Sequence, residues 1–363
     1  MTSDPGVGER GGSATAPRTE PWPTCPACGS DAARERFVLE DRAHGVPGRY
    51  RYVTCTVCGT VRQSPCVVDA DLPDLYPPVY LEAHPRPDRG PGAPVEAADR
   101  RLRSRVRARI RDSVTGRGSS TVGTALGLVR GLRERAFGGR APDEFLPRRS
   151  DPGRALDVGC GLGNQMEVLA GLGWAVEGVE VDPRSARAAA DLTGAPVHVG
   201  DVRTLELPAG GYRLILLHHV VEHLSDPVAV LASLAPLLAP RGRVVLVYPN
   251  PHALAARRFG PAWMGWDAPR HLVLPPPSAL SRLATLGGLR LRSRRTTARN
   301  ALAHLAHSRG MAARPGVAAT VTGQATVSDR ALAALERALV AAGIDVGEEV
   351  IAVLDRAPGA VEP

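Results

Sequence analysis

Residues 154 to 250 alternate short apolar runs with helical segments, and this alternation restricts the fold more than any other feature of the chain. The five apolar runs have the character of strands and lie at residues 154–159, 175–182, 195–201, 212–219 and 242–250. Strands that alternate with helices predict βαβ units and therefore a parallel sheet with helices on both faces. The expected fold class is α/β, a doubly wound, Rossmann-like sheet that binds ligands beyond the carboxyl ends of its strands.

The first of these strands leads into a glycine-rich turn, LDVGCGLGNQ. Its glycines are Gly159, Gly161 and Gly163, whereas the dinucleotide fingerprint GxGxxG requires a small residue at the position that Asn164 occupies. Asp157 precedes the turn, and a carboxylate there attracts an ammonium group and repels a pyrophosphate. The turn therefore predicts a nucleoside-like ligand with a positive charge rather than a dinucleotide.

Two further acidic residues follow neighbouring strands of the expected sheet. Glu180 ends the second strand, where a carboxylate can accept hydrogen bonds from both hydroxyls of a ribose. Asp201 follows the third strand, within reach of an adenine amino group. An amino-acid end, a ribose and an adenine are the three parts of S-adenosylmethionine, so the three positions together indicate this cofactor.

Residues 152–255 resemble a class I S-adenosylmethionine-dependent methyltransferase, because the motifs LDVGCGLG, GVEVD, VGD, LHHVVEH and VYPN occur in this family's order. The resemblance implies that Asp157 and the three glycines bind the methionine end of the cofactor. It further implies that Glu180 binds the ribose and Asp201 the adenine, with His218 as an additional cofactor-binding residue.

The same resemblance implies that the sheet ends with two more strands, the last of them inserted antiparallel. Residues 290–296 and 348–356 are the candidates for these strands. The intervening insertion, at about 298–347, contains an amphipathic helix predicted at residues 328–343, which is suited to a cap or a dimer surface.

The candidate catalytic residues follow the fourth strand, in HHVVEHLSDP. Glu222 and His223 place a carboxylate beside an imidazole, a pair suited to removing a proton from a hydroxyl or an activated carbon. We expect His223 to be the general base, Glu222 to orient it or to bind a substrate hydroxyl, and His271 to be the reserve base. The alternative is that Glu222 and His223 only cap and anchor the following helix. The Asn/Asp-Pro-Pro-aromatic motif common in nucleic-acid and protein amino-methylating relatives does not occur here.

Four cysteines form two CxxC pairs, each followed by glycine and separated by 26 residues: Cys25, Cys28, Cys55 and Cys58. Two such pairs complete a closed tetrahedral site, which predicts a structural Zn²⁺ rather than a catalytic one. The alternatives are a disulfide pair, which a reducing compartment disfavours, and a redox motif, which requires a single pair. The segment WMGWDAPRHLVLPPPSALSRL resembles bacterial methyltransferases with an N-terminal zinc module, enzymes of sugar, cell-envelope glycan and secondary-metabolite tailoring. In that segment Arg270 is either an anion ligand or a loop hydrogen-bond donor.

The expected organisation has four parts: a disordered N-terminus, a zinc-binding module, a Pro-rich connector with an Arg-rich helical segment, and the methyltransferase domain. Their bounds are 1–22, 23–66, 67–150 and 151–363. The formal net charge is +8, yet the basic residues are all arginine, a bias that a GC-rich coding sequence produces without selection for nucleic acid. The Arg-rich segment is therefore either a solvated face or a surface for an anionic partner.

These features predict a methyltransferase that acts on an oxygen or carbon atom of a small molecule, such as a sugar, a cell-envelope glycan precursor or a secondary metabolite. The alternative is a nucleic-acid methyltransferase or binding protein that docks through the zinc module and the Arg-rich segment. The N-terminus lacks the apolar segment of a secretory signal, and no apolar run approaches the roughly 18 residues that a membrane span requires. We therefore expect a cytoplasmic protein.

Overall fold

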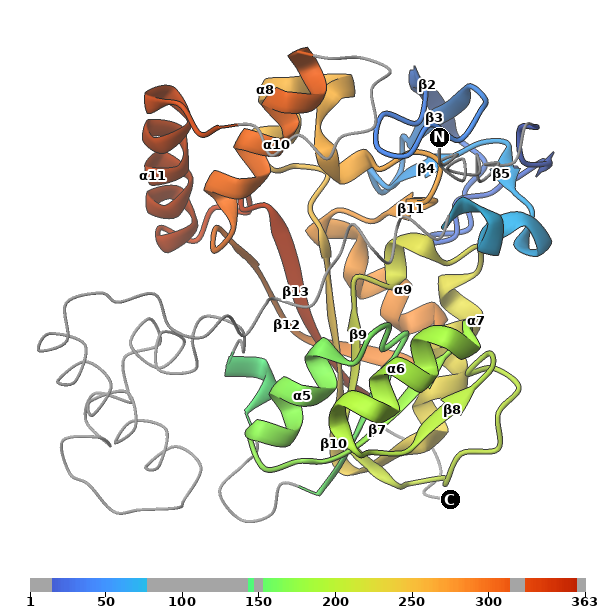
Figure 1. Cartoon of the computed structure of the whole chain (residues 1–363). Coiled ribbons are helices and arrows are strands. Elements are labelled where there is room, and N and C mark those ends of the chain that lie inside the picture. The colour runs from blue at the N-terminus through green and yellow to red at the C-terminus, as the bar shows by residue number, and fades with distance from the viewer. Residues whose placement is uncertain (1–14, 77–142, 147–152, 314–323, 358–363) are drawn as a thin grey trace, which may run out of the picture.

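A computed structural model describes residues 15–76, 143–146, 153–313 and 324–357, and its centre is a seven-stranded sheet (Figure 1). The strand order is β12-β13-β10-β9-β6-β7-β8. The strands are β6 (Arg154–Val158), β7 (Ala175–Glu180), β8 (Val197–Val199), β9 (Tyr212–His218), β10 (Leu238–Pro249), β12 (Leu289–Thr297) and β13 (Glu349–Arg356). Strands β6 to β10 pair in parallel, whereas β13 pairs antiparallel with both β10 and β12. The doubly wound sheet and both late strands are confirmed.

Helices cover the two faces of this sheet, because successive side chains of each strand point to opposite faces. One face packs on α5 (Asn164–Gly171) and α6 (Pro183–Thr193), and the other on α7 (Pro227–Leu234) and α9 (Leu280–Leu286). Asp182 and Asp226 cap α6 and α7, each just before a proline at the first helical position. Side chains along β9 and β10 therefore alternate between two hydrophobic cores, one on each face of the sheet. The first core contains Leu214, Leu216, Val245 and Val247, and the second contains Ile215, Leu217, Val244 and Leu246.

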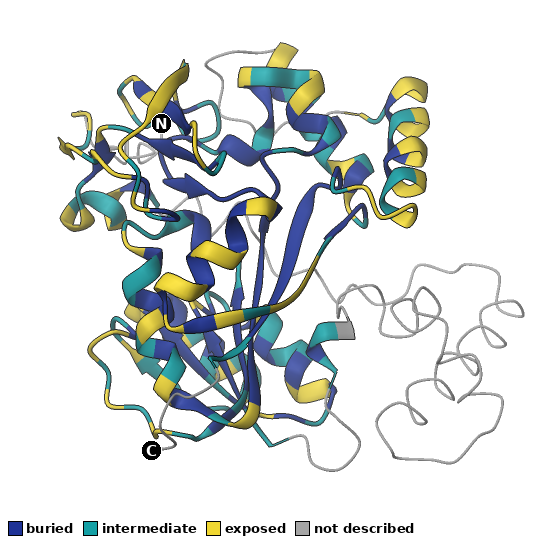
Figure 2. Ribbon diagram, turned by 180° about the vertical axis from the view of Figure 1, so that it is seen from behind, coloured by how far each residue is buried: buried dark blue, intermediate teal, exposed yellow. Residues whose placement is uncertain are grey.

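The N-terminal module, residues 15–76, is built on a four-stranded antiparallel sheet of order β11-β4-β3-β2. The strands that residues 15–76 themselves contribute are β1 (Thr19–Glu20), β2 (Ala33–Leu39), β3 (Tyr50–Cys55), β4 (Val61–Gln63) and β5 (Cys66–Val67), of which β2, β3 and β4 belong to this sheet. The 3-10 helix η1 (Asp69–Leu75) follows them. Strand β11 (Val273–Leu274) comes from the C-terminal half of the chain and pairs with β4. The buried side chains of the module belong to the same hydrophobic core as those of β9 and β10 (Figure 2). The module is therefore packed directly on the larger domain.

Three more helices lie toward the N-terminal module's end of the sheet in Figure 1: α8 (Leu254–Phe259), α10 (Ala301–Ala313) and α11 (Val327–Ala341). Helix α11 confirms the amphipathic helix predicted in the insertion, and Thr326 and Asp329 form a capping box at its start. Short 3-10 helices complete the fold: η2 (Asp143–Phe145), η3 (Val221–His223), η4 (Ala235–Leu237), η5 (Gly260–Ala262), η6 (Met264–Trp266) and η7 (Pro277–Ala279). Most of the Arg-rich segment lies outside the described residues. Within those residues, no helix is long and apolar enough to cross a membrane.

Candidate functional site

The glycine turn connects β6 to α5 at the carboxyl end of the sheet. Gly159, Gly161 and Gly163 all have positive φ, at 68°, 53° and 83°. A Cβ on Gly163 would lie 2.9 Å from the Cα of Ala189, so glycine there lets α5 and α6 approach closely. A Cβ on Gly161 would meet nothing within 4 Å, so the chain presents bare backbone to open space at this position. This geometry suits a ligand that lies against the turn.

Glu180 lies at the end of β7 and supports the glycine turn. Its Oε2 accepts a hydrogen bond from the backbone N–H of Gly161 at 2.8 Å, and its Oε1 accepts two, from Val181 at 2.8 Å and from Asp182 at 3.1 Å. A carboxylate has about four acceptor positions, so these three bonds leave about one, on Oε2, for a ribose hydroxyl. The structure therefore gives Glu180 a role that the sequence did not predict, which is to fix the turn.

Asp157 lies in β6 beneath the turn, 2% exposed, and its Oδ2 has no hydrogen-bond partner. Burial and the nearby Glu180 raise the pKa of Asp157 to about 8. A buried carboxyl that lacks a partner is costly, and a cationic group placed beside it would remove that cost. The expectation of an ammonium-bearing ligand fits this arrangement.

Asp201 and His218 complete the predicted cofactor set. Asp201 follows β8 and forms an ion pair with Arg203, with an Nη2 to Oδ2 distance of 2.5 Å. Its side chain is 36% exposed, so it lies at the surface of the carboxyl edge. His218 ends β9, with its ring 6.3 Å from that of Phe145, and burial lowers its pKa to about 3. His218 is therefore neutral near pH 7, and its contact with the cofactor stays a prediction.

Glu222, in η3, is fully buried and bonded to a histidine that the sequence analysis did not select. His219 Nδ1 lies 3.0 Å from Glu222 Oε1, and His219 Nε2 lies 3.1 Å from Glu349 Oε1 at the start of β13. Burial opposes ionisation of Glu222, but the bond to His219 outweighs it and lowers the pKa of Glu222 to about 2. The Oε2 atom of Glu222 is buried and has no partner.

His223 and His271 lie together, as the sequence-based catalytic assignment requires. Their ring centroids are 4.7 Å apart, and with Glu222 they offer three ligand-type atoms that lie within 4.8 Å of one another. His223 Nδ1 lies 3.0 Å from the carbonyl oxygen of Arg270 and 2.8 Å from the Tyr76 hydroxyl. A carbonyl only accepts, so Nδ1 carries the proton and Nε2 is the basic nitrogen. Burial lowers the pKa of His223 to about 4, which leaves it neutral near pH 7.

His271 has the same arrangement. Its Nδ1 lies 2.8 Å from the carbonyl oxygen of Gly265, so Nδ1 carries a proton. Nε2 lies 4.0 Å from Glu222 Oε1 and 3.9 Å from Asp267 Oδ2. Two imidazoles therefore lie beside one buried carboxylate at the carboxyl end of β9.

Arg270 is occupied by protein carboxylates, which disfavours one of its two predicted roles, that of a ligand for a substrate anion. Its guanidinium is fully buried, 2.8 Å from Asp41 Oδ2 in the N-terminal module and 2.6 Å from Asp267 Oδ1. It also donates to the carbonyl oxygen of Leu75 at 3.5 Å. Arg270 thus joins the N-terminal module to the segment that carries His271.

The four cysteines of the N-terminal module converge from two turns. The Cys25 and Cys58 sulfurs are 3.6 Å apart, as are those of Cys28 and Cys55. In a tetrahedral zinc site with Zn–S bonds of about 2.3 Å, the sulfurs are about 3.8 Å apart. None of these cysteines is in a disulfide. The donor set and its spacing therefore fit Zn²⁺ without rearrangement.

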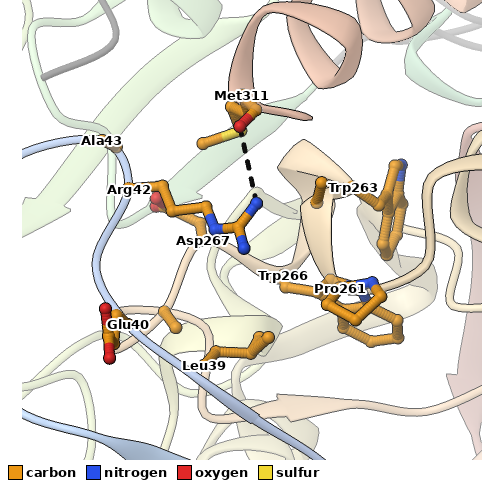
Figure 3. Close-up of a pocket in the computed structure, with 11 residues that line it drawn as sticks. Leu39, Glu40, Arg42, Ala43, Pro261, Trp263, Trp266, Asp267 and Met311 are labelled. Atoms are coloured by element: carbon orange, nitrogen blue, oxygen red, sulfur yellow. Dashed lines mark hydrogen bonds between the residues drawn. The ribbon is translucent and has the colours of Figure 1, made fainter. Parts of the chain in front are cut away.

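A small pocket lies between the N-terminal module and α10 (Figure 3). Leu39 and Arg42 line it from the module, Trp266 and Asp267 from the segment after α8, and Met311 from α10. Arg42 Nη1 donates to the carbonyl oxygen of Met311 at 3.4 Å. Because Asp267 also contacts His271, this pocket adjoins the candidate catalytic cluster.

Residues 130–294 match the protein family described as a methyltransferase domain, and the sheet has the order and the antiparallel final strand that the resemblance implied. This region of the chain is therefore similar to a methyltransferase domain. Of the described N-terminal module, residues 15–76, no part lies within the matched range.

Curated relatives of the methyltransferase domain include enzymes of ubiquinone biosynthesis. The ubiquinone biosynthesis O-methyltransferase of Cereibacter sphaeroides (strain ATCC 17025 / ATH 2.4.3) is 36% identical over 121 residues, 31% of this chain and 49% of that protein. The corresponding protein of Caulobacter sp. (strain K31) is 32% identical over 145 residues, 38% of this chain and 55% of that protein. The chain thus spans about half the length of the curated relatives it matches.

Solved structures are similar at lower identity. An S-adenosylmethionine-dependent methyltransferase from Mesorhizobium loti is 15% identical with a TM-score of 0.39, and the match covers 64% of this chain and 100% of that one. A geranyl diphosphate C-methyltransferase from Streptomyces coelicolor A3(2) is 17% identical with a TM-score of 0.39, covering 56% and 70% of the two chains.

Sequence reasoning missed the partners of the catalytic cluster in the methyltransferase domain. His219 bonds Glu222, and Asp41 and Asp267 bond Arg270, all residues that the sequence did point to, whereas Glu349 bonds His219 itself. A usable signal existed for His219, which precedes Glu222 by three residues. The other partners are far away in the chain or in irregular segments, where no local pattern marks them.

Proposed function

We propose that this protein transfers a methyl group from S-adenosylmethionine to an oxygen or carbon atom of a small molecule. The observation that carries the proposal is the unpartnered, buried carboxyl of Asp157 beneath a turn of three glycines with positive φ. In this proposal Asp157 and the glycines receive the methionine end, Glu180 the ribose, Asp201 the adenine amino group, and His218 lines the same edge. A phosphate ligand is disfavoured here, because the Glu180 carboxylate already accepts a hydrogen bond from the backbone N–H of Gly161 and places negative charge beside the turn.

The cofactor supplies an electrophilic methyl group for an in-line displacement, so the chain has to position the acceptor and remove its proton. We assign proton removal to Nε2 of His223, since Nδ1 is held by the Arg270 carbonyl oxygen. Glu222 stabilises the imidazolium that forms, and His271 is the reserve base. The lowered pKa of His223 keeps it in the neutral form that accepts a proton.

A small-molecule acceptor is favoured over a nucleic acid. The curated relatives are named for ubiquinone biosynthesis, whose intermediates are small molecules. The sequence also lacks the Pro-Pro-aromatic motif of amino-methylating relatives. The proposed acceptor is a sugar, a cell-envelope glycan precursor or a secondary metabolite with an ionisable hydroxyl or an acidic C–H.

Calorimetry with S-adenosylhomocysteine tests the cofactor site. Asp157→Asn keeps the side-chain volume but removes the charge, and should weaken binding by roughly 10- to 100-fold, the usual value of a hydrogen bond to a charged group. Asp191→Asn, an exposed change on α6, is the matched control and should bind like the original protein. Equal binding by both variants, or tighter binding of NAD, would contradict the proposal.

Methyl transfer itself is tested with tritiated S-adenosylmethionine and a panel of phenols, sugar nucleotides and 1,3-dicarbonyl compounds. Incorporation into one of these classes is the expected result. Incorporation only into RNA or DNA, together with a gel shift that weakens steeply with salt, would instead support the nucleic-acid alternative.

A further inference from the structure

His219 occupies an unusual position at the carboxyl end of the parallel sheet. It follows the last residue of β9 with a φ of 57°, a left-handed conformation that few non-glycine residues adopt. Its backbone N–H donates to the Val247 carbonyl oxygen on β10 at 2.8 Å. Because β10 lies between β9 and β13, the ring of His219 reaches across the end of β10 to Glu349 on β13.

Both ring nitrogens of His219 face carboxylate oxygens, those of Glu222 at 3.0 Å and Glu349 at 3.1 Å. An ionised carboxylate only accepts hydrogen bonds, so satisfying both contacts requires an N–H at each nitrogen. The geometry therefore calls for the imidazolium form. Burial opposes this charge, but the two carboxylates outweigh it and raise the pKa of His219 to about 10.

The charged groups around His219 come from several elements. Glu349 also pairs with Arg299, at 3.5 Å between Nη2 and Oε2. The nearby histidines are His218 on β9, His304 on α10 and His223 on η3, and burial lowers the pKa of each to about 3 or 4, so they are neutral near pH 7. Near pH 7 the immediate set thus contains two cations, His219 and Arg299, and two anions, Glu222 and Glu349.

We propose that His219 is a positioning residue for methyl transfer: as a permanent imidazolium it fixes Glu222 as an oriented carboxylate beneath the catalytic histidines. The hydrogen bond from His219 goes to Oε1 of Glu222, and the Oε2 atom of Glu222 has no partner. His271 Nε2 lies 4.0 Å from the same Oε1 atom. A ring nitrogen of His223, the proposed base, also lies within 4.8 Å of a Glu222 carboxylate oxygen, so the imidazole that takes up the acceptor proton has a fixed negative neighbour. The bond to Glu349 ties this carboxylate to the antiparallel strand β13.

This inference rests on the proposed function for the catalytic meaning of Glu222, but its first test needs neither cofactor nor acceptor. Protein with ¹⁵N-labelled histidine is followed by NMR from about pH 5.5 to about pH 8.5, a range in which an ordinary histidine loses its proton near about pH 6.5. We expect one histidine with two protonated ring nitrogens throughout this range, and its signal should vanish in His219→Gln. A His219 signal that titrates like an ordinary histidine would overturn the proposal.

The second test asks what His219 does to Glu222. In His219→Gln, one cation is lost from the buried set, so one more carboxyl should become protonated and give an infrared band that is absent from the original protein and disappears in the double variant His219→Gln/Glu222→Gln. His198→Gln is the matched control, because His198 also bonds a glutamate, Glu177, at 3.2 Å on the β7–β8 side of the sheet. No carboxyl band in His219→Gln, or the same band in His198→Gln, would contradict the assignment.

Once an acceptor is found, the pH profile of kcat gives the functional readout. In His219→Gln the imidazolium beside Glu222 is lost, so the acidic limb of the profile should move to higher pH by about one to three pH units. The affinity for S-adenosylhomocysteine should stay unchanged. A profile of unchanged shape with reduced height would show a merely structural role. If the original protein does not bind S-adenosylhomocysteine, the proposed function is wrong. The NMR result on His219 can still be interpreted in that case, because it needs neither cofactor nor acceptor.

Discussion

Asp41→Asn is the substitution that best tests how the N-terminal module is joined to the methyltransferase domain. Asp41 and Arg270 are both fully buried, with bonds of 2.8 Å and 3.0 Å between the carboxylate and the guanidinium. Removing one partner of a buried ion pair costs about 3–5 kcal/mol, because the other charge is left buried. Arg270 keeps its two bonds to Asp267, so we expect the lower end of this range, about 3 kcal/mol.

Urea unfolding of Asp41→Asn, followed by tryptophan fluorescence, measures this loss. Glu40→Gln is the matched control, since Glu40 pairs with Arg49 at 4.0 Å on the exposed surface of the same loop. Exposed pairs contribute about 0–1 kcal/mol, so the control should unfold almost like the original protein. Equal destabilisation by the two variants would refute the claim that the buried pair joins the two parts.

The pH dependence gives the same prediction an independent check. Burial opposes ionisation of Asp41, but the bonds from Arg270 and the backbone outweigh it and lower its pKa. A depressed pKa means that the ionised group adds stability above the ordinary aspartate pKa of about 3.9, and that this stability is lost as the pH falls through the lowered value. The stability difference between the original protein and Asp41→Asn should therefore be full near neutral pH and shrink in acid.

Two other predictions concern the metal and the base. Elemental analysis should find about one zinc per chain, and Cys28→Ser should lower the zinc content and destabilise the N-terminal module; metal-free protein with unchanged stability would rule the site out. His223→Ala should lower turnover by roughly 10²- to 10⁴-fold while S-adenosylhomocysteine binding stays unchanged, and His271→Ala is measured beside it. Full turnover in His223→Ala with a loss in His271→Ala would move the base to His271.

The sheet could be predicted from the sequence because its strands are marked by local patterns. The parallel strands are continuous apolar runs, and the glycine turn with Asp157 and Glu180 is encoded within about two dozen neighbouring residues. The four cysteines are equally local, since each CxxC pair forms its own turn. The final antiparallel strand required the family resemblance, because its apolar run alone does not set its direction.

The partners of the catalytic cluster could not be predicted in this way. Glu349 looks like an ordinary charged residue at the start of a strand, yet it bonds His219, 130 residues earlier in the chain. Asp41 and Arg270 are 229 residues apart, and no local pattern marks them as partners. Such contacts depend on how the module and the sheet pack together, and packing leaves no periodic signal in a single sequence. The two alternative roles of Arg270 stayed open for the same reason, because its partner Asp41 is not visible locally.

The contacts between the two parts explain why a methyltransferase domain carries a four-cysteine module. One CxxC turn joins β3 to β4, and β4 pairs with β11, which begins two residues after His271. The Tyr52 hydroxyl donates to the His271 carbonyl oxygen at 2.8 Å, and Tyr76 contacts His223. Under the proposed function, the module therefore holds the acceptor side of the site, whereas Asp157 and Glu180 lie on β6 and β7 and do not contact it. It follows that loss of the metal should impair methyl transfer through the two histidines and leave cofactor binding intact, a pattern that a separate partner-binding module would not produce.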